Sequence, residues 1–356
     1  MKYEPAYDGL RAISIFCVVV YHINEQLLPG GWAGVDVFFV LSGFLITSIL
    51  NREIIEFGRL NYKLFYIKRF LRLGPALIAV VIATMVVGFL SKNGDFSTNY
   101  LTPALVALAY FMNWSRAFDV FPQGLLGHTW SLSMEEQFYI CWPLLFMFTF
   151  WRRPLVWLSA AIIASTIWRM YLAFNGVDLN RTYNGFDTHA DGLMIGCVVA
   201  LLNTCDRTRL ERIAAKSVAI PIILMIFIFA LLNIRNIFTQ SIGLGISAFL
   251  TAWLILAIKN CNWWRNFLSL NLLVYTGRLS YGWYLWHYPF LQITKRFFSP
   301  TDVAKIIIIN IFIFCGSYLL AMMSFRYLEQ PFLKLKGTLT RKIALTTTTP
   351  LFEKGS

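Results

Sequence analysis

Arg11 and His22 are the two residues whose types and spacing most directly suggest chemistry. They lie in the long apolar stretch from Tyr7 to Leu45, where polar groups are energetically expensive and are therefore functional candidates. On an α-helix, eleven residues make about three turns and rise about 16 Å, so both side chains fall on one face. That face would carry a permanent cation at one end and a base at the other. It indicates a fixed cation and a titratable base on one helix face, about 16 Å apart.

Asp36 and Glu135 are candidate partners for His22. In the topology derived below, histidines and carboxylates recur near the outer ends of several spans, at His22, His128, His189, His287, Asp36, Glu135, Glu136 and Asp191. A histidine and a carboxylate at one level describe a general base with an orienting partner. Asp36 or Glu135 could orient the ring of His22 and stabilise its protonated form. For Asp36, a structural bond to a neighbouring helix is an equally good interpretation, and His287 reads as a structural residue of an interfacial aromatic belt.

Arg69 and Arg72 stand three residues apart in a basic amphipathic segment, NYKLFYIKRFLRL at 61–73. One interpretation is a surface helix that anchors the inner face to anionic lipid. The other is capture of phosphates by two arginines on one helix face. Charge alone favours the anchor. With Arg11 and Arg278, however, the pair could hold a polyanionic ligand such as a nucleotide cofactor on the cytoplasmic side.

The composition excludes several other functions. The net charge of +13 is expected of cytoplasmic loops and does not indicate nucleic-acid binding. No H-x-x-x-H or H-E-x-x-H pair occurs, so no metal is expected. The six cysteines show no C-x-x-C spacing, which indicates neither a disulfide framework nor a thiolate metal site.

The elements that must position these residues are membrane helices. With 58% hydrophobic and only 14% charged residues, the chain is predicted to be an all-α, polytopic integral membrane protein. We expect about ten transmembrane helices, at 10–28, 32–50, 75–90, 132–150, 154–174, 189–204, 217–234, 238–258, 273–294 and 304–326. A shorter apolar segment, 101–114, is expected to be re-entrant or interfacial.

The basic residues predict the topology. If segment 101–114 does not cross, most of the 31 Lys and Arg residues fall on the side that holds both termini, which the positive-inside rule makes cytoplasmic. We expect a multi-pass membrane protein, with a membrane domain at 1–336 and a short polar cytoplasmic tail at 337–356; the family resemblance described below implies that the membrane is a bacterial inner membrane. Composition alone would favour a transporter, because multi-spanning transporters also carry intramembrane carboxylates and histidines.

Six ordered motifs resemble the acyltransferase 3 family of integral-membrane O-acyltransferases. They are YDGLRAI with Arg11-x10-His22, GGWAGVDVFFVLSGFLIT at 30–47, RFLR at 69–72, HTWSLSMEEQFYICWPL at 128–144, LSYGWYLWHYPF at 279–290 and FRYLEQPF at 325–332. Together they run from Tyr7 to Phe332, and six in the right order are specific. One departure is THADGLMIG at 188–196, where His189 stands at a position that is commonly basic in the family.

The resemblance implies an acyl-CoA donor, usually acetyl-CoA, and a carbohydrate hydroxyl as acceptor. By position, His22 would be the essential histidine with Arg11 as its partner, Arg69 and Arg72 would serve the donor, and Glu135 would match the regular acidic position. The expected reaction is transfer of acetyl to a cell-surface glycan or lipid-linked glycan on the outer side of the membrane. Larger relatives carry an extra esterase-like domain that is not found here, so lipopolysaccharide O-antigen is the first expected acceptor. Peptidoglycan, exopolysaccharide, lipo-oligosaccharide and macrolides stay open, as does a transporter of acetyl groups or glycan.

Overall fold

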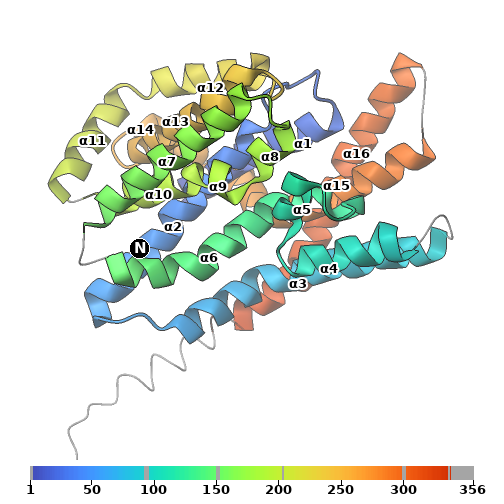
Figure 1. Ribbon diagram of the computed structural model, residues 1–356, viewed down its shortest axis with the longest axis horizontal. Helices are drawn as coiled ribbons and strands as arrows, with labels where there is room; N and C mark the ends of the chain where they lie inside the picture. Colours follow the sequence, from blue (N-terminus) through green and yellow to red (C-terminus); the bar gives the residue numbers. More distant parts are fainter. Residues whose placement is uncertain are drawn as a thin grey trace, which may run out of the picture.

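The protein folds into helices only, in the part of the chain that its computed structural model describes, which is residues 3–91, 96–149, 153–202, 204–298, 302–335 and 337. The helices are α1 (Pro5–Ile23), α2 (Ala33–Phe57), α3 (Tyr62–Ser91), α4 (Thr102–Leu108), α5 (Met112–Phe118), α6 (Trp130–Thr149), α7 (Pro154–Phe174), α8 (Leu179–Asn184), α9 (Phe186–His189), α10 (Asp191–Leu201), α11 (Thr204–Lys216), α12 (Ala219–Leu231), α13 (Leu244–Ala257), α14 (Asn262–Leu268), α15 (Asn271–Phe297) and α16 (Val303–Ser324) (Figure 1). Four short helical turns complete them: η1 (Ser97–Leu101), η2 (Gly124–Thr129), η3 (Thr239–Gly243) and η4 (Phe325–Glu329).

Six helical stretches of the described chain are long and apolar enough to cross a membrane: α1, α2, α3, α7, η3 with α13, and the stretch from Val303 to Leu335. A seventh is possible if α11 and α12, which meet at a bend of 68°, form one broken span. The prediction of a multi-pass, all-α membrane protein is thus confirmed, whereas the predicted number of about ten is not. Helices do occupy the other predicted positions, but α10 and α12 are short, and α6 and α15 fall outside the set because their sequences are more polar.

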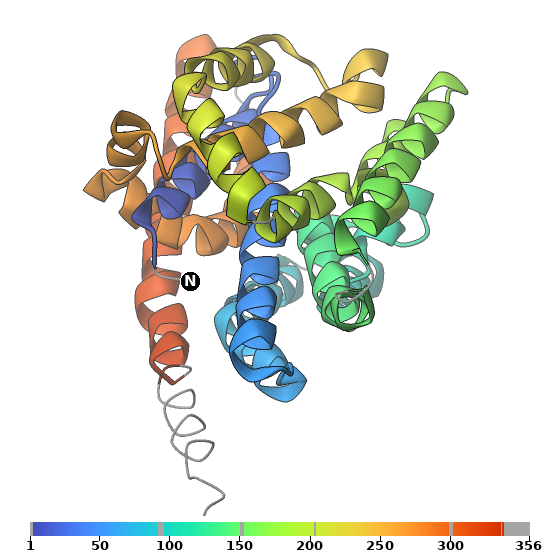
Figure 2. The same cartoon turned by 90° about the vertical axis from the view of Figure 1, so that its left-hand side faces the viewer.

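The outer flanks of the bundle carry the apolar side chains expected of a lipid-facing surface. Figure 2 shows α7 in green and α16 in orange-red on opposite flanks, with α2 in blue between them. Ile163 and Ile167 of α7 and Ile308 and Phe312 of α16 are more than half exposed. A soluble protein rarely leaves such rows of apolar residues in water, so these faces are expected to contact hydrocarbon.

The centre of the fold is built by α1 and α2, whose partners come from the other end of the sequence. α2 packs along α10, and α1 packs along α15. A Cβ added to Gly43 of α2 would lie 1.9 Å from the carbonyl oxygen of Leu193, and one added to Gly196 of α10 would lie 2.1 Å from that of Val40. Two helices approach this closely only through residues without side chains. Gly43 and Gly196 are therefore packing residues of the contact between α2 and α10.

The amphipathic segment at 61–73 does not form a separate surface helix. It is the first part of α3, which continues as one helix through Pro75 to Ser91. Pro75 has no backbone N–H and so cannot donate a hydrogen bond to the preceding turn, but α3 continues through it. Arg69 and Arg72 are consequently held rigidly at the end of a membrane helix.

The apolar segment at 101–114 is split into two helices of seven residues each, α4 and α5. Tyr110 lies between them with a left-handed backbone, φ 52°, which ends α4 and reverses the direction of the chain. Seven residues rise only about 10 Å, so neither helix spans a bilayer alone. The predicted polar tail at 337–356 lies outside the described residues, apart from Gly337.

Candidate active site

His22 forms a hydrogen bond with a second histidine from a distant part of the sequence. It stands in the last turn of α1, and its Nδ1 lies 2.9 Å from Nε2 of His287 in α15. The two rings are stacked, with centroids 5.1 Å apart. His287 is 1% exposed. α1 and α15 pack along each other, so this pair sits at one of the most extensive helix interfaces.

The backbone around His287 determines which ring nitrogen of His22 is free. Nδ1 of His287 lies 2.6 Å from the carbonyl oxygen of Tyr284 and 3.1 Å from that of Trp283. A carbonyl oxygen can only accept, so Nδ1 of neutral His287 carries the proton and its Nε2 is an acceptor. His22 must then donate from Nδ1, which leaves Nε2 of His22 with a lone pair. This tautomer is assigned from the hydrogen-bond network, and it is the one that a general base requires.

His128 is the third member of this histidine cluster, which we define as His22, His128 and His287. It lies in η2, is 1% exposed, and packs its ring against His287 with centroids 5.6 Å apart. Neither ring nitrogen has a hydrogen-bond partner among the described residues. The hydroxyl of Tyr284 donates to the carbonyl of His128 and accepts a bond from Ser131 at 2.7 Å. The backbone at His128 is thus fixed, while its imidazole is buried with no hydrogen-bond partner among the described residues.

The histidine cluster is not arranged to hold a metal. The nitrogens of His22 and His287 that face each other are joined by a hydrogen bond, so they cannot both direct lone pairs at an ion. Among the residues that the structure describes, no group of three or more His, Cys, Asp or Glu side chains could hold a metal ion.

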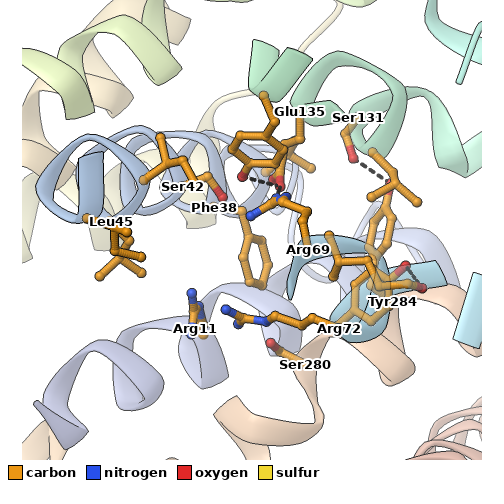
Figure 3. Close-up of a pocket in the computed structure, with 17 residues that line it drawn as sticks. Arg11, Phe38, Ser42, Leu45, Arg69, Arg72, Ser131, Glu135, Ser280 and Tyr284 are labelled. Carbon is orange, nitrogen blue, oxygen red and sulfur yellow. Dashed lines mark hydrogen bonds and ion pairs between the residues drawn. The ribbon is translucent and has the colours of Figure 1, made fainter. Parts of the chain in front are cut away.

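Arg11, Arg69 and Arg72 line one cavity, which we call the arginine pocket (Figure 3). Its other walls come from α2, α6 and α15, and include Ser42, Ser131, Glu135, Tyr139, Ser280 and Tyr284. Figure 3 shows the side chains of Arg11 and Arg72 pointing toward one another across the cavity. The like charges of Arg11 and Arg72 repel each other, so a negatively charged ligand between them would stabilise the site.

The three arginines are not equally available to such a ligand. Arg69 donates from Nε to Glu136 at 3.3 Å, lies 3.8 Å from Glu135, and places its guanidinium 3.1 Å from the centroid of the Tyr139 ring. Arg11 pairs with Asp8 at 3.0 Å. Arg72 has no ion pair or hydrogen bond with any residue in the described part of the chain. Arg72 is therefore the group with most capacity to bind an anion.

Asp36 does not orient His22, so that interpretation is wrong. Asp36 is 1% exposed and its Oδ1 lies 2.8 Å from Nε2 of His189. The other nitrogen of His189 donates to the carbonyl of Tyr183 at 2.7 Å. Because a carbonyl must receive a proton there, neutral His189 would present a lone pair to Asp36, so the pair requires a proton on His189 or on the carboxyl. Asp36 thus stabilises the packing of α2 against α9 and α10.

Glu135 also lies apart from His22, in the arginine pocket. It accepts a hydrogen bond of 3.0 Å from the hydroxyl of Tyr139 and faces Arg69. Its interpretation as a partner of the imidazole is therefore wrong, and its carboxylate instead balances the charge of Arg69. Arg11 lines this same pocket rather than touching His22, as three helical turns separate them.

A buried ion pair occupies the segment where the sequence departs from the family pattern. Arg169 of α7, which is 0% exposed, lies 2.8 Å from Asp191 and donates to the carbonyl of Thr188 at 2.6 Å. A basic partner for Asp191 is therefore present, but it comes from α7 instead of the neighbouring sequence position. The motif around His189 and Asp191 thus has a structural role that joins α7, α9 and α10.

Arg116 is a cation beside the histidine cluster that sequence reasoning missed. It lies in α5, donates to the carbonyl of Gly127 at 3.1 Å, and is close enough to His22 and His128 for their charges to interact. Its Nε is buried with no hydrogen-bond partner in the described chain. Segment 101–114 therefore leads into a helix that helps to hold the turn carrying His128.

His287 and His128 were also missed as site residues. His287 was interpreted as structural because it follows Trp286 near a predicted interface, and nothing local in the sequence indicates its contact with His22. One signal was available: both histidines were predicted at the same outer level as His22. Arg69 and Arg72, in contrast, line one pocket, and the phosphate binding predicted for them stays a prediction.

The chain matches the family model described as an acyltransferase domain over residues 4–323. It is 34% identical over 359 residues to the peptidoglycan O-acetyltransferase OatA of Listeria monocytogenes, an alignment that covers 94% of this chain and 56% of the relative. It is 30% identical over 353 residues to the O-acetyltransferase OatA of Staphylococcus aureus, covering 94% and 58%. The chain thus spans less than three fifths of these relatives. No solved structure matches it.

Proposed function

We propose, because the chain belongs to the acyltransferase 3 family, that it transfers an acetyl group from cytoplasmic acetyl-CoA to a hydroxyl of a cell-envelope carbohydrate. The arginine pocket would receive the phosphates of the donor, and Nε2 of His22 would act as the general base. The observation that carries this proposal is the arrangement on α1. This helix carries Arg11 in the wall of the arginine pocket and, about 16 Å further on, ends at a histidine whose hydrogen bond defines its free nitrogen.

The acceptor hydroxyl would lose its proton to Nε2 of His22 as its oxygen attacks the thioester carbonyl. The C–O bond forms while the carbonyl electrons move to oxygen, which gives a tetrahedral intermediate. Collapse of this intermediate breaks the C–S bond, and the imidazolium returns the proton to the leaving thiolate. General-base assistance of this kind contributes roughly 10²–10⁴-fold. His287 would hold Nδ1–H of His22 throughout, as the third member of a catalytic triad does.

For the acceptor, the first sequence-based expectation was lipopolysaccharide O-antigen, whereas the printed name of the Listeria relative specifies peptidoglycan. We propose peptidoglycan as the first acceptor to assay, since it is the one that a similar protein supports. O-antigen is the second. The site itself supports a hydroxyl nucleophile in either polymer, because the base and the donor cavity are the same for both.

Transport of acetyl groups without transfer is the competing function. A gain of acetyl mass on envelope glycan in cells that express the chain, and none in cells that express His22→Ala, would support transfer. Phe16→Ala serves as the matched control, because Phe16 is on the same helix and 49% exposed. Movement of acetyl label into liposomes with no acetylated glycan would instead establish a transporter and exclude our proposal.

A further inference from the structure

A second cavity lies at the opposite end of α1 from the arginine pocket. Its lining includes Asn24, Lys295, Phe298 and Asn310, with Ile23 and Ile306. Ile23 and Asn24 directly follow His22 in the sequence. In Figure 1 the end of α1, the end of α15 and the start of α16 all lie toward the right-hand side. Along the chain, His22 therefore lies between Arg11, which lines the arginine pocket, and Ile23 and Asn24, which line this second cavity.

Asn310 is the most informative residue of this cavity. It lies within α16, in the sequence KIIIINIFIF, where its neighbours are apolar. No hydrogen bond joins its amide to any residue that the structure describes. A polar side chain in a membrane helix is expensive unless it has a partner, and such residues commonly mark a ligand pathway. An unpartnered amide that lines a cavity indicates a ligand with hydrogen-bonding groups.

Lys295 gives the cavity a positive charge at a fixed place. Its Nζ donates to the carbonyl of Ile23 at 3.0 Å, which attaches the ammonium to the C-terminal end of α1. A cation is stabilised there by the helix dipole. The ammonium therefore adds a positive charge to the lining of the cavity.

The side chains of the cavity suit a sugar with an acidic substituent. Asn310 offers a donor and an acceptor, and Asn24 offers its NH₂ while its oxygen accepts from the N–H of Gln26 at 3.0 Å. Amides match hydroxyl groups because both give and receive hydrogen bonds. The ring of Phe298 provides an apolar surface for the face of a sugar ring. A lipid acyl chain offers no hydrogen-bonding group to the amide of Asn310, so the cavity favours a sugar over a lipid tail.

We propose that this cavity binds the acceptor glycan, with Asn310 and Asn24 on sugar hydroxyls and Lys295 on a carboxylate or phosphate of the acceptor. This inference rests on the proposed acetyl transfer, because it assigns the second substrate of that reaction. It also accounts for the position of His22, whose free nitrogen would lie between the donor carbonyl and the hydroxyl.

The kinetic test uses three soluble acceptors with the full chain in detergent or nanodiscs. They are the N-acetylglucosamine–N-acetylmuramic acid disaccharide, its neutral analogue chitobiose, and a disaccharide on a short isoprenyl pyrophosphate. Asn310→Ala is expected to raise the KM of all three roughly tenfold, as two lost hydrogen bonds would, with the KM of acetyl-CoA unchanged. Lys295→Gln is expected to raise KM for the charged acceptors alone. The carboxylate and the pyrophosphate arms then distinguish which anion it binds.

The matched control is Asn271→Ala, because Asn271 is an exposed asparagine at the other end of α15. It is expected to leave every KM unchanged. An unchanged acceptor KM in Asn310→Ala and Lys295→Gln, or a rise in the KM of acetyl-CoA instead, would overturn the acceptor assignment.

Binding can also be measured without any acetyl transfer. Ile306→Cys introduces a thiol into the cavity, in a chain whose exposed Cys141 and Cys315 are replaced by serine. The muramic acid disaccharide is expected to slow labelling of this thiol by a membrane-impermeant maleimide. Equal labelling rates with and without the disaccharide would exclude the cavity as the acceptor site. If labelling is slowed but no glycan is acetylated, the proposed function fails while the binding site stands.

Discussion

The arginine pocket and the histidine cluster lie about three helical turns apart along α1. Different kinds of interaction hold their side chains in place. In the arginine pocket, ion pairs fix the side chains: Arg69 with Glu135 and Glu136, and Arg11 with Asp8. In the histidine cluster, neutral hydrogen bonds to backbone carbonyls fix them. In the arginine pocket, carboxylates compensate the permanent charges of the arginines. In the histidine cluster, the proposed base is held by neutral groups, which leave it uncharged and able to accept a proton.

The largest expected effect comes from removing the base. His22→Ala should lower kcat for acetyl transfer by roughly 10³–10⁴-fold, because the acceptor hydroxyl then has no group to accept its proton. Binding of acetyl-CoA, measured by calorimetry on the purified protein, should be unchanged, since the arginine pocket does not include this side chain. A variant that lost donor binding to the same extent would show that the two regions are one site.

A smaller loss is expected when the second imidazole is removed. In serine proteases, loss of the group that fixes the histidine tautomer costs about 10⁴-fold, and a neutral partner should supply less, so we expect roughly 10²-fold for His287→Ala. The loss should appear in kcat and not in the KM of acetyl-CoA. His287→Gln should recover part of the rate, because its amide oxygen can accept from Nδ1 of His22. If both variants kept the parental kcat, the tautomer argument would fail.

We expect Arg72 to bind the donor and Arg69 to stabilise the fold. Arg72→Met is expected to raise the KM of acetyl-CoA about tenfold, the effect of one charge-assisted hydrogen bond to phosphate. Arg69→Met should instead lower thermal stability, because it leaves Glu135 and Glu136 without their cation. Melting curves and donor kinetics on both variants provide the comparison. Equal donor effects with unchanged melting would indicate that Arg69 also contacts the donor.

The smallest effect on catalysis is expected at Asp36. Asp36→Asn should destabilise the protein, by about 3 kcal/mol or less, since it weakens a buried pair with His189. Its kcat at a temperature where it is folded should stay within about twofold of the parent, a change smaller than one hydrogen bond. Activity assays below the melting temperature, with a thermal-shift measurement, separate these outcomes. A loss of kcat comparable to that of His287→Ala would show that Asp36 contributes to catalysis after all.

The sequence predicts the local features of this protein well. The eleven-residue spacing of Arg11 and His22 depends only on helix geometry, and the line of apolar runs depends only on composition. The paired arginines were also found, since Arg69 and Arg72 are neighbours on one helix face. These predictions need no knowledge of which helices touch.

The partners across helices were not predicted, and the reason is physical. His22 and His287 are 265 positions apart, and Asp36 and His189 are 153 apart, so helix packing alone decides each pair. A common level in the membrane limits the candidates but does not choose among four histidines. The predicted number of spans was uncertain for a related reason. Runs such as α6 and α15 have the length of spans, but polar residues such as Ser133 and His287 lower their hydropathy and are buried inside the protein.

Tyr284 belongs to both regions at once. Its ring lines the arginine pocket, while its hydroxyl bonds to the carbonyl of His128 and to Ser131. The Tyr284 ring lines the arginine pocket and also lies 5.3 Å from the His128 ring, so a donor arm that reached from the pocket toward the histidine cluster would contact it. The ring can swing aside only by releasing the turn that carries His128. Binding of the donor would then move the residues around His128. We expect donor and acceptor to bind in a compulsory order, with the donor first.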